Sequence, residues 1–218
     1  QAKAPGTFQH CLQVMNLVDA VGHATEADVH LLRAAALYHD IGKMQNPLCF
    51  VENESSNPDA PKYHAGKAPQ DSARDIIRHV EDGLAIADEH RLPDIIKAFI
   101  RTHHGTSTTA YFLNQYLNAG GDPAQTDVFR YPGQKPTTKE EVILMVCDSI
   151  EAASRTLRDF SPESCDRFVE GIVAGKEQAG QLEDADITLR DMNVMKKILK
   201  TYLQQIYHAR IAYPKRKG

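Results

Sequence analysis

The sequence lacks paired cysteines, a basic excess and a long apolar run. Its four cysteines, Cys11, Cys49, Cys147 and Cys165, are scattered and form no Cys-x-x-Cys pair. This spacing argues against an all-cysteine zinc site or a disulfide framework and indicates reduced thiols, as in cytosol. The formal net charge of −4 argues against a general nucleic-acid-binding protein, so we expect no nucleic-acid polymer as partner. No apolar run approaches the roughly 18 to 20 residues needed to cross a bilayer.

The alternation of apolar and polar residues that is typical of strands is also missing, whereas helical periodicity runs along most of the chain. In residues 7–21, apolar side chains recur at steps of three and four, which predicts a first helix carrying His10. With 218 residues and 42% hydrophobic residues, the chain is long enough for one well-filled core. We therefore predict an all-α fold, a helical bundle formed by a single domain over residues 1–218.

Capping residues and breakers predict the ends of several helices. Thr25 followed by Asp28 resembles a capping box that opens a second helix, and Gly42 is expected to end it. Thr138 and Glu141 form a second capping-box pattern. Residues 45–70 indicate a long loop, and residues 71–90 a continuous helix. The last two helices are predicted to begin near residues 161 and 188, with the glycines at 171, 175 and 180 breaking the pattern between them.

Histidines and aspartates stand on or at the ends of several predicted helices: His10, His39, Asp40, His79, His103, His104 and Asp148. Helical proteins build metal sites by presenting such side chains inward from facing helices. Seven nitrogen and oxygen ligands without a thiolate are too many for one tetrahedral zinc, and they suit two six-coordinate iron(II) or manganese(II) ions with Asp40 as a bridge. Asp148 lies within an apolar run, where a buried carboxylate needs a cation or strong hydrogen bonds.

The order of the candidate ligands, and the longer sequence segments around them, resemble a known family. The H…HD…D order resembles the HD-domain metal-dependent phosphohydrolases, and the extra histidines resemble their two-metal members. The phrases "GTFQHCLQVMNL", "LYHDIGKMQNPLCFVEN", "HHGT" and "FRYPGQKPTTKEEVILMVCDSIEAA" are similar to the cytosolic catalytic domain of bacterial seven-transmembrane HD proteins, the PgpH-type cyclic di-AMP phosphodiesterases. This similarity spans roughly residues 6 to 158. The GYP of the HD-GYP phosphodiesterases, which act on cyclic di-GMP, is missing.

The resemblance implies roles for individual residues. His10, His39, Asp40 and Asp148 would hold one metal ion, and Asp40, His79, His103 and His104 the other. The catalytic residues would be Asp40 and Lys43, and Lys43 would contact phosphate or stabilise charge in the transition state. The alternative for Lys43 is a surface lysine that caps a helix C-terminus. Arg130, Tyr131 and Lys135 are further candidates for substrate contact, with Tyr131 stacking on a base.

The resemblance also implies a reaction, which is hydrolysis of cyclic di-AMP to linear pApA by a water held between two divalent cations. Two alternatives stay open: hydrolysis of another nucleotide phosphate ester such as (p)ppGpp, or a mixed-valent di-iron HD oxygenase. The sequence opens without methionine, as "QAKAPGTFQH". We accordingly expect a cytoplasmic domain of a longer protein of the bacterial inner membrane, in contact with the membrane only through other parts of that protein. The sequence leaves the oligomeric state open.

Overall fold

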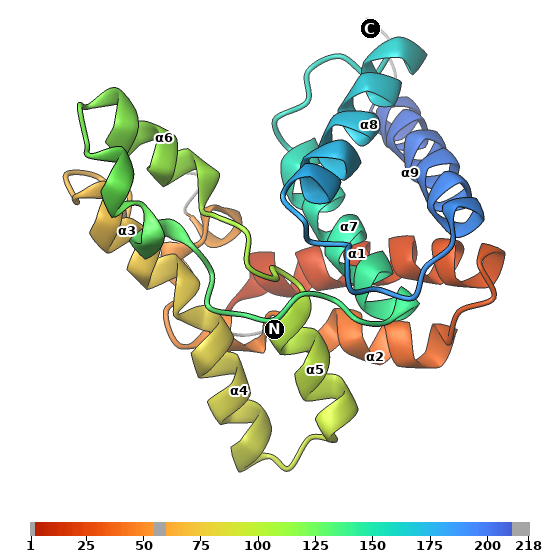
Figure 1. Cartoon of the computed structure of the whole chain (residues 1–218), viewed down its shortest axis with the longest axis horizontal. Coiled ribbons are helices and arrows are strands. Elements are labelled where there is room, and N and C mark those ends of the chain that lie inside the picture. The colour runs from red at the N-terminus through yellow and green to blue at the C-terminus, as the bar shows by residue number, and fades with distance from the viewer. Residues whose placement is uncertain (1–2, 55–59, 211–218) are drawn as a thin grey trace, which may run out of the picture.

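Helices form nearly all the regular structure of the computed structural model, which describes residues 3–54 and 60–210 (Figure 1). The α-helices in chain order are α1 (Pro5–Ala24), α2 (Val29–Tyr38), α3 (Pro69–Ile77), α4 (His79–Glu89), α5 (Asp94–Thr102), α6 (Ala110–Asn118), α7 (Lys139–Ser154), α8 (Pro162–Gln178) and α9 (Leu189–Arg210). Short 3-10 helices cover Ile41–Met44, Pro47–Cys49, Val51–Asn53, Pro123–Gln125 and Asp127–Phe129. Over the described ranges, extended pairing is limited to isolated bridges. The predicted all-α fold is confirmed.

The main core surrounds α1, which packs against α2, α7 and α9. The apolar stripe predicted for α1 is fully buried at Val14, Leu17, Val18 and Val21. In α7, the apolar run 142–147 is buried on every side, so this helix passes through the core and carries Asp148 with it. Each fully buried aliphatic side chain contributes about 1.5–3 kcal/mol relative to an exposed one. None of the described helices combines the length and the apolar character that crossing a membrane requires.

A second, smaller cluster is formed by Ala73, Phe112 and Phe129, where α3, α6 and the 3-10 helix Asp127–Phe129 meet. Figure 1 shows α3, α4 and α6 on one side of the molecule and α7, α8 and α9 on the other, with α5 between them. The candidate ligands come from elements of both sides.

The caps explain where several helices begin. The capping box of Thr138 and Glu141 is present at the start of α7, and the Ser161 side chain caps α8, as predicted. The prediction for Thr25 is wrong, because α1 continues to Ala24 and the Thr25 hydroxyl donates back to the carbonyl of Val21 (2.9 Å). Asp28 is the residue that caps α2, by accepting from the backbone N–H of Leu31.

Three predicted helix boundaries differ in the structure, and two of them involve glycine. Gly42 does not end α2, which already stops at Tyr38. It instead permits a close approach to α4, since a Cβ at Gly42 would lie 1.9 Å from the carbonyl oxygen of His79. The helix predicted for residues 71–90 is divided at Arg78 into α3 and α4. Gly171 and Gly175 lie inside α8 and do not break it, because a glycine costs a helix only about 1 kcal/mol. The predicted loop 45–70 contains short 3-10 helices between residues 47 and 53.

Candidate metal centre

The seven predicted ligands converge from distant parts of the chain. His10 comes from α1, His39 and Asp40 follow α2, His79 begins α4, His103 and His104 follow α5, and Asp148 lies in α7. They form two groups in which the ligand atoms all lie within 4.8 Å of one another: His10, His39, Asp40 and Asp148, termed here site A, and Asp40, His79, His103 and His104, termed site B. The division is the one that the family resemblance implies.

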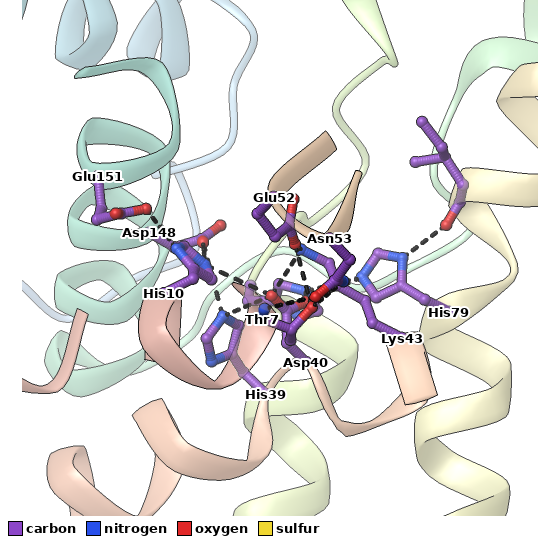
Figure 2. Close-up of polar contacts among 12 residues, drawn as sticks. Thr7, His10, His39, Asp40, Lys43, Glu52, Asn53, His79, Asp148 and Glu151 are labelled. Atoms are coloured by element: carbon purple, nitrogen blue, oxygen red, sulfur yellow. Dashed lines mark hydrogen bonds and ion pairs between the residues drawn. The ribbon is translucent and has the colours of Figure 1, made fainter. Parts of the chain in front are cut away.

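Asp40 belongs to both sites, and Figure 2 shows it between His10 and His39 on one side and His79 on the other. Its Oδ2 lies 3.4 Å from Nε2 of both His10 and His39. Its Oδ1 lies 3.5 Å from Nε2 of His79 and 3.6 Å from Nε2 of His103. Asp148 completes site A, with Oδ1 2.9 Å from His10 Nε2. One carboxylate can therefore serve two cations.

Helix ends orient three of the histidines. Nδ1 of His39 lies 2.9 Å from the carbonyl oxygen of Ala36, and Nδ1 of His79 lies 2.6 Å from that of Ile76. His103 makes the same contact with Ile100, at 2.9 Å. In each case the acceptor is three residues earlier, in the last turn of a helix. Since the carbonyl oxygen can only accept, Nδ1 donates and the lone pair of each neutral imidazole is left on Nε2, which points to Asp40.

The same geometry has an electrostatic consequence. The C-termini of α2, α3 and α5 all lie beside the two sites, because His39 and His103 are C-cap residues and His79 follows the C-cap of α3. A helix C-terminus carries about half a negative elementary charge. Three helix ends and two buried aspartates, Asp40 and Asp148, favour positive charge at this place.

Several buried polar atoms in sites A and B lack hydrogen-bond partners in the described part of the chain, which shows whether the two sites suit cations. Asp40 Oδ1 and His39 Nε2 are buried and have no hydrogen-bond partner among the described residues. Nε2 of His79 and Nε2 of His103 lie only 3.2 Å apart, although both carry lone pairs when their Nδ1 atoms donate. A cation would satisfy all four atoms, and nitrogen and oxygen donors suit iron(II) or manganese(II). The residues present therefore fit two metal ions.

The protonation of the histidines differs between the sites. Burial lowers the pKa of His79 to about 3 and holds the pKa of His104 well below its ordinary value, so these two imidazoles of site B are neutral. Burial also disfavours the charged form of His10, but hydrogen bonds to Asp148 and Glu151 outweigh it and raise the pKa. A metal ion in site A would replace this proton.

Lys43 lies inside the centre, which argues against a surface capping role. Its Nζ is 2.7 Å from Asp40 Oδ2 and 2.9 Å from Glu52 Oε1, and its side chain is 12% exposed. Burial opposes its charge, but Asp40 and Glu52 outweigh burial and raise the pKa of Lys43, so it stays cationic. The hydroxyl of Thr7 also donates to Glu52. Glu52 lies in an aperiodic segment, so no sequence pattern indicated a role for it.

Glu151 is a second residue that the sequence analysis missed. It is 4% exposed, and its Oε2 accepts from His10 Nδ1 and from Arg155 Nη2, the latter at 2.7 Å. Arg155 also lies 3.6 Å from Glu52 through Nη1. The available signal was the spacing, because residues three apart on a helix share a face and Glu151 follows Asp148 at that interval.

The predicted substrate contacts occupy different surroundings. Tyr131 is 7% exposed and its ring stacks on His104, with centroids 4.3 Å apart, so little of it is left for a base. Arg130 is exposed and donates from Nη1 to the carbonyl of Thr106 (2.9 Å). Lys135 forms an ion pair with Glu183 (3.0 Å). For all three, substrate contact stays a prediction.

The chain matches a known family model and is similar to known proteins. Residues 7–153 match the HD domain family model. The chain is 38% identical over 212 residues to a cyclic-di-AMP phosphodiesterase PgpH of Bacillus subtilis and 36% identical over 214 residues to one of Listeria monocytogenes, with 97% of this chain covered in each case. It spans only 29% of the length of either relative.

Solved structures also match the chain over almost its whole length. The crystal structure of the HD domain of the L. monocytogenes phosphodiesterase PgpH matches with a TM-score of 0.86 and 34% identity, covering 95% of this chain and 96% of that one. The structure of that domain in complex with cyclic-di-AMP matches with a TM-score of 0.88 and 33% identity, covering 94% of each chain.

Proposed function

The chain belongs to the HD-domain family, and from that premise we propose that it hydrolyses cyclic di-AMP to linear pApA with the help of two divalent metal ions. The observation that carries the proposal is Asp40, whose two oxygens face two separate groups of ligands. The relatives that are named cyclic-di-AMP phosphodiesterases support the choice of substrate, as does the solved HD domain in complex with that nucleotide.

Sites A and B would each hold one ion, with Asp40 shared between them. We propose iron or manganese, because seven nitrogen and oxygen donors without a thiolate suit these ions. When bound, two divalent ions would lower the pKa of water and neutralise charge on the phosphodiester.

The protein residues would contribute position and fixed charge. Lys43 would place its ammonium group at the phosphate oxygens, because Asp40 and Glu52 hold it from two sides. A preorganised cation of this kind stabilises charge that develops in the transition state. Arg130, Tyr131 and Lys135 would form the walls that prefer an intact cyclic dinucleotide over the opened chain, so onward cleavage of pApA to AMP would be slow and cyclic di-GMP would be a poorer substrate.

We also propose that residues 1–218 form one catalytic domain of a longer bacterial inner-membrane protein and that this domain faces the cytoplasm. The basis is the length of the relatives, of which this chain covers less than a third.

The test combines metal analysis of anaerobically purified protein with chromatography of reaction products. We expect two iron or manganese ions per chain and conversion of cyclic di-AMP to pApA before AMP accumulates. A single zinc per chain would contradict the two-metal site. Turnover of other nucleotides in place of cyclic di-AMP would indicate a different phosphate ester, and oxygen consumption with a substrate that carries no phosphate would indicate an oxygenase.

A further inference from the structure

A cavity of about 570 Å³ lies where the segment that follows α5 faces α7 and α8. Two of its lining residues lie close to predicted ligands in the chain. Thr106 is two residues beyond His104, and Ser149 is the residue after Asp148. The volume lies within the range of about 300–1,000 Å³ that small-molecule sites occupy. We call this cavity the α8 groove.

Two cations line the α8 groove without a carboxylate partner. Lys176 and Arg130 both contribute to its walls, and neither forms an ion pair with any described residue. Two other lysines have carboxylate partners, since Lys135 pairs with Glu183 and Lys200 with Glu170. Burial lowers the pKa of Lys176, and Asp148 is the charged group that acts on it, which places this ammonium within electrostatic reach of site A. An unpaired, partly desolvated cation is a ready partner for an anion.

Two positions on one turn of α8 place no side chain in the groove. Gly171 and Gly175 are four residues apart, so they share a face of the helix, and both line the groove. A Cβ added at either position would meet nothing within 4 Å. Neither close packing nor a positive φ therefore requires a glycine at these positions, and both are unfavourable in a helix. Their effect is to keep the groove open.

Gln181 fixes the end of the groove. It is 1% exposed, its Oε1 accepts from the backbone N–H of Thr106 (2.8 Å), and its Nε2 donates to the Thr106 hydroxyl (3.0 Å). This pair of bonds joins the chain after α8 to the chain after α5. The two walls are thus held at a set distance before any ligand arrives.

We propose that the α8 groove binds the half of a cyclic dinucleotide that does not react, with Lys176 and Arg130 holding its second phosphate and the glycine face of α8 admitting its nucleoside. This inference rests on the proposed function, because it needs a substrate with two phosphates. It adds Lys176, Gly171 and Gly175 to the residues that select the substrate. A diester with a single phosphate would not use them.

The experiment compares cyclic di-AMP with bis(p-nitrophenyl) phosphate, a small diester that carries one phosphate. Lys176→Met removes the charge, and Gly175→Leu fills the groove with a residue that helices favour. Lys197→Met is the matched control, since Lys197 is an exposed lysine of α9 outside the groove. We expect each groove variant to raise KM for cyclic di-AMP by about tenfold or more, the effect of losing roughly 1.4 kcal/mol of binding. Cleavage of the small diester, metal content and melting temperature should match those of the wild type.

Two results would overturn the inference. Unchanged KM for cyclic di-AMP in both groove variants would show that the groove does not hold the substrate. An equal loss on both substrates would show that the variants disturb the metal centre. Failure of the proposed function is recognised separately, because the wild type itself would then cleave the small diester and leave cyclic di-AMP intact.

Discussion

Removing the Glu151 carboxylate should weaken site A and leave site B unchanged. Glu151 contacts no ligand except His10, whose Nδ1–H it accepts, and this bond directs the lone pair of His10 Nε2 toward Asp40 and Asp148. Outer partners of this kind typically contribute 10- to 100-fold to metal affinity, which corresponds to about 1.4–2.7 kcal/mol. Glu151→Ala also leaves Arg155 without its closest partner, so we expect an effect near the upper end of that range.

Glu151→Gln gives the more specific result. An amide oxygen can still accept from His10 Nδ1 while the charge is lost, so the Gln variant should recover part of the affinity and fall near tenfold below the wild type. The assay is titration of metal-free protein with Mn²⁺, followed by electron paramagnetic resonance to resolve a first and a second binding step. A variant that had merely lost its fold would weaken both steps and would not be rescued by glutamine.

A matched control lies on α8. Glu170 pairs with Lys196 and Lys200 and is 43% exposed, so Glu170→Ala makes the same chemical change without touching the centre. It should bind two ions with the affinity of the wild type. The reasoning would be refuted if both Glu151 variants folded normally and bound the site A ion as tightly as the wild type does.

Four further predictions address the shared carboxylate, the buried lysine, the metal ions and a helix cap. Asp40→Ala should lose both ions by elemental analysis, whereas His104→Ala should lose mainly the ion of site B; two ions per chain in the Asp40 variant would contradict a shared ligand. Lys43→Ala should keep its metal content but lose on the order of 10² in single-turnover rate, and an unchanged rate would limit Lys43 to a structural role. Chelation of the metals should abolish hydrolysis, and Mn²⁺ or Fe²⁺ should restore it more fully than Ca²⁺. Thr138→Ala should lower the free energy of unfolding in urea by about 1 kcal/mol without changing activity per folded molecule; an unchanged midpoint would show that the capping box contributes little.

The sequence predicts that the candidate ligands converge because each of them belongs to a local pattern. His39 and His103 close amphipathic helices, and Asp148 interrupts an apolar run. Glu52 was missed for the opposite reason, since it lies in a segment without periodicity and reaches Lys43 only through tertiary packing.

The predicted helix boundaries are wrong where tertiary contacts determine the real ones. Gly42 looked like a helix end, but it is needed because the chain after Asp40 passes against α4 with no room for a Cβ. Gly171 and Gly175 looked like breakers, yet packing on the other face of α8 outweighs their low helix propensity, and Val169 and Val173 are buried there. Sequence periodicity reports which face is apolar, and it does not report which neighbour comes close.

The charges around the centre show how an acidic chain could bind the proposed polyanionic substrate. With the histidines neutral, as metal ligands are, the four carboxylates of Asp40, Asp148, Glu52 and Glu151 outnumber the nearby cations Lys43 and Arg155 by two. Such an excess in a buried place is unfavourable by itself, and it would repel a nucleotide. Two divalent ions would change the local charge from −2 to +2, which balances the two negative charges of the phosphodiesters in a cyclic dinucleotide. The net charge of −4 is therefore compatible with this substrate, because the local balance in the loaded centre decides which ligand enters.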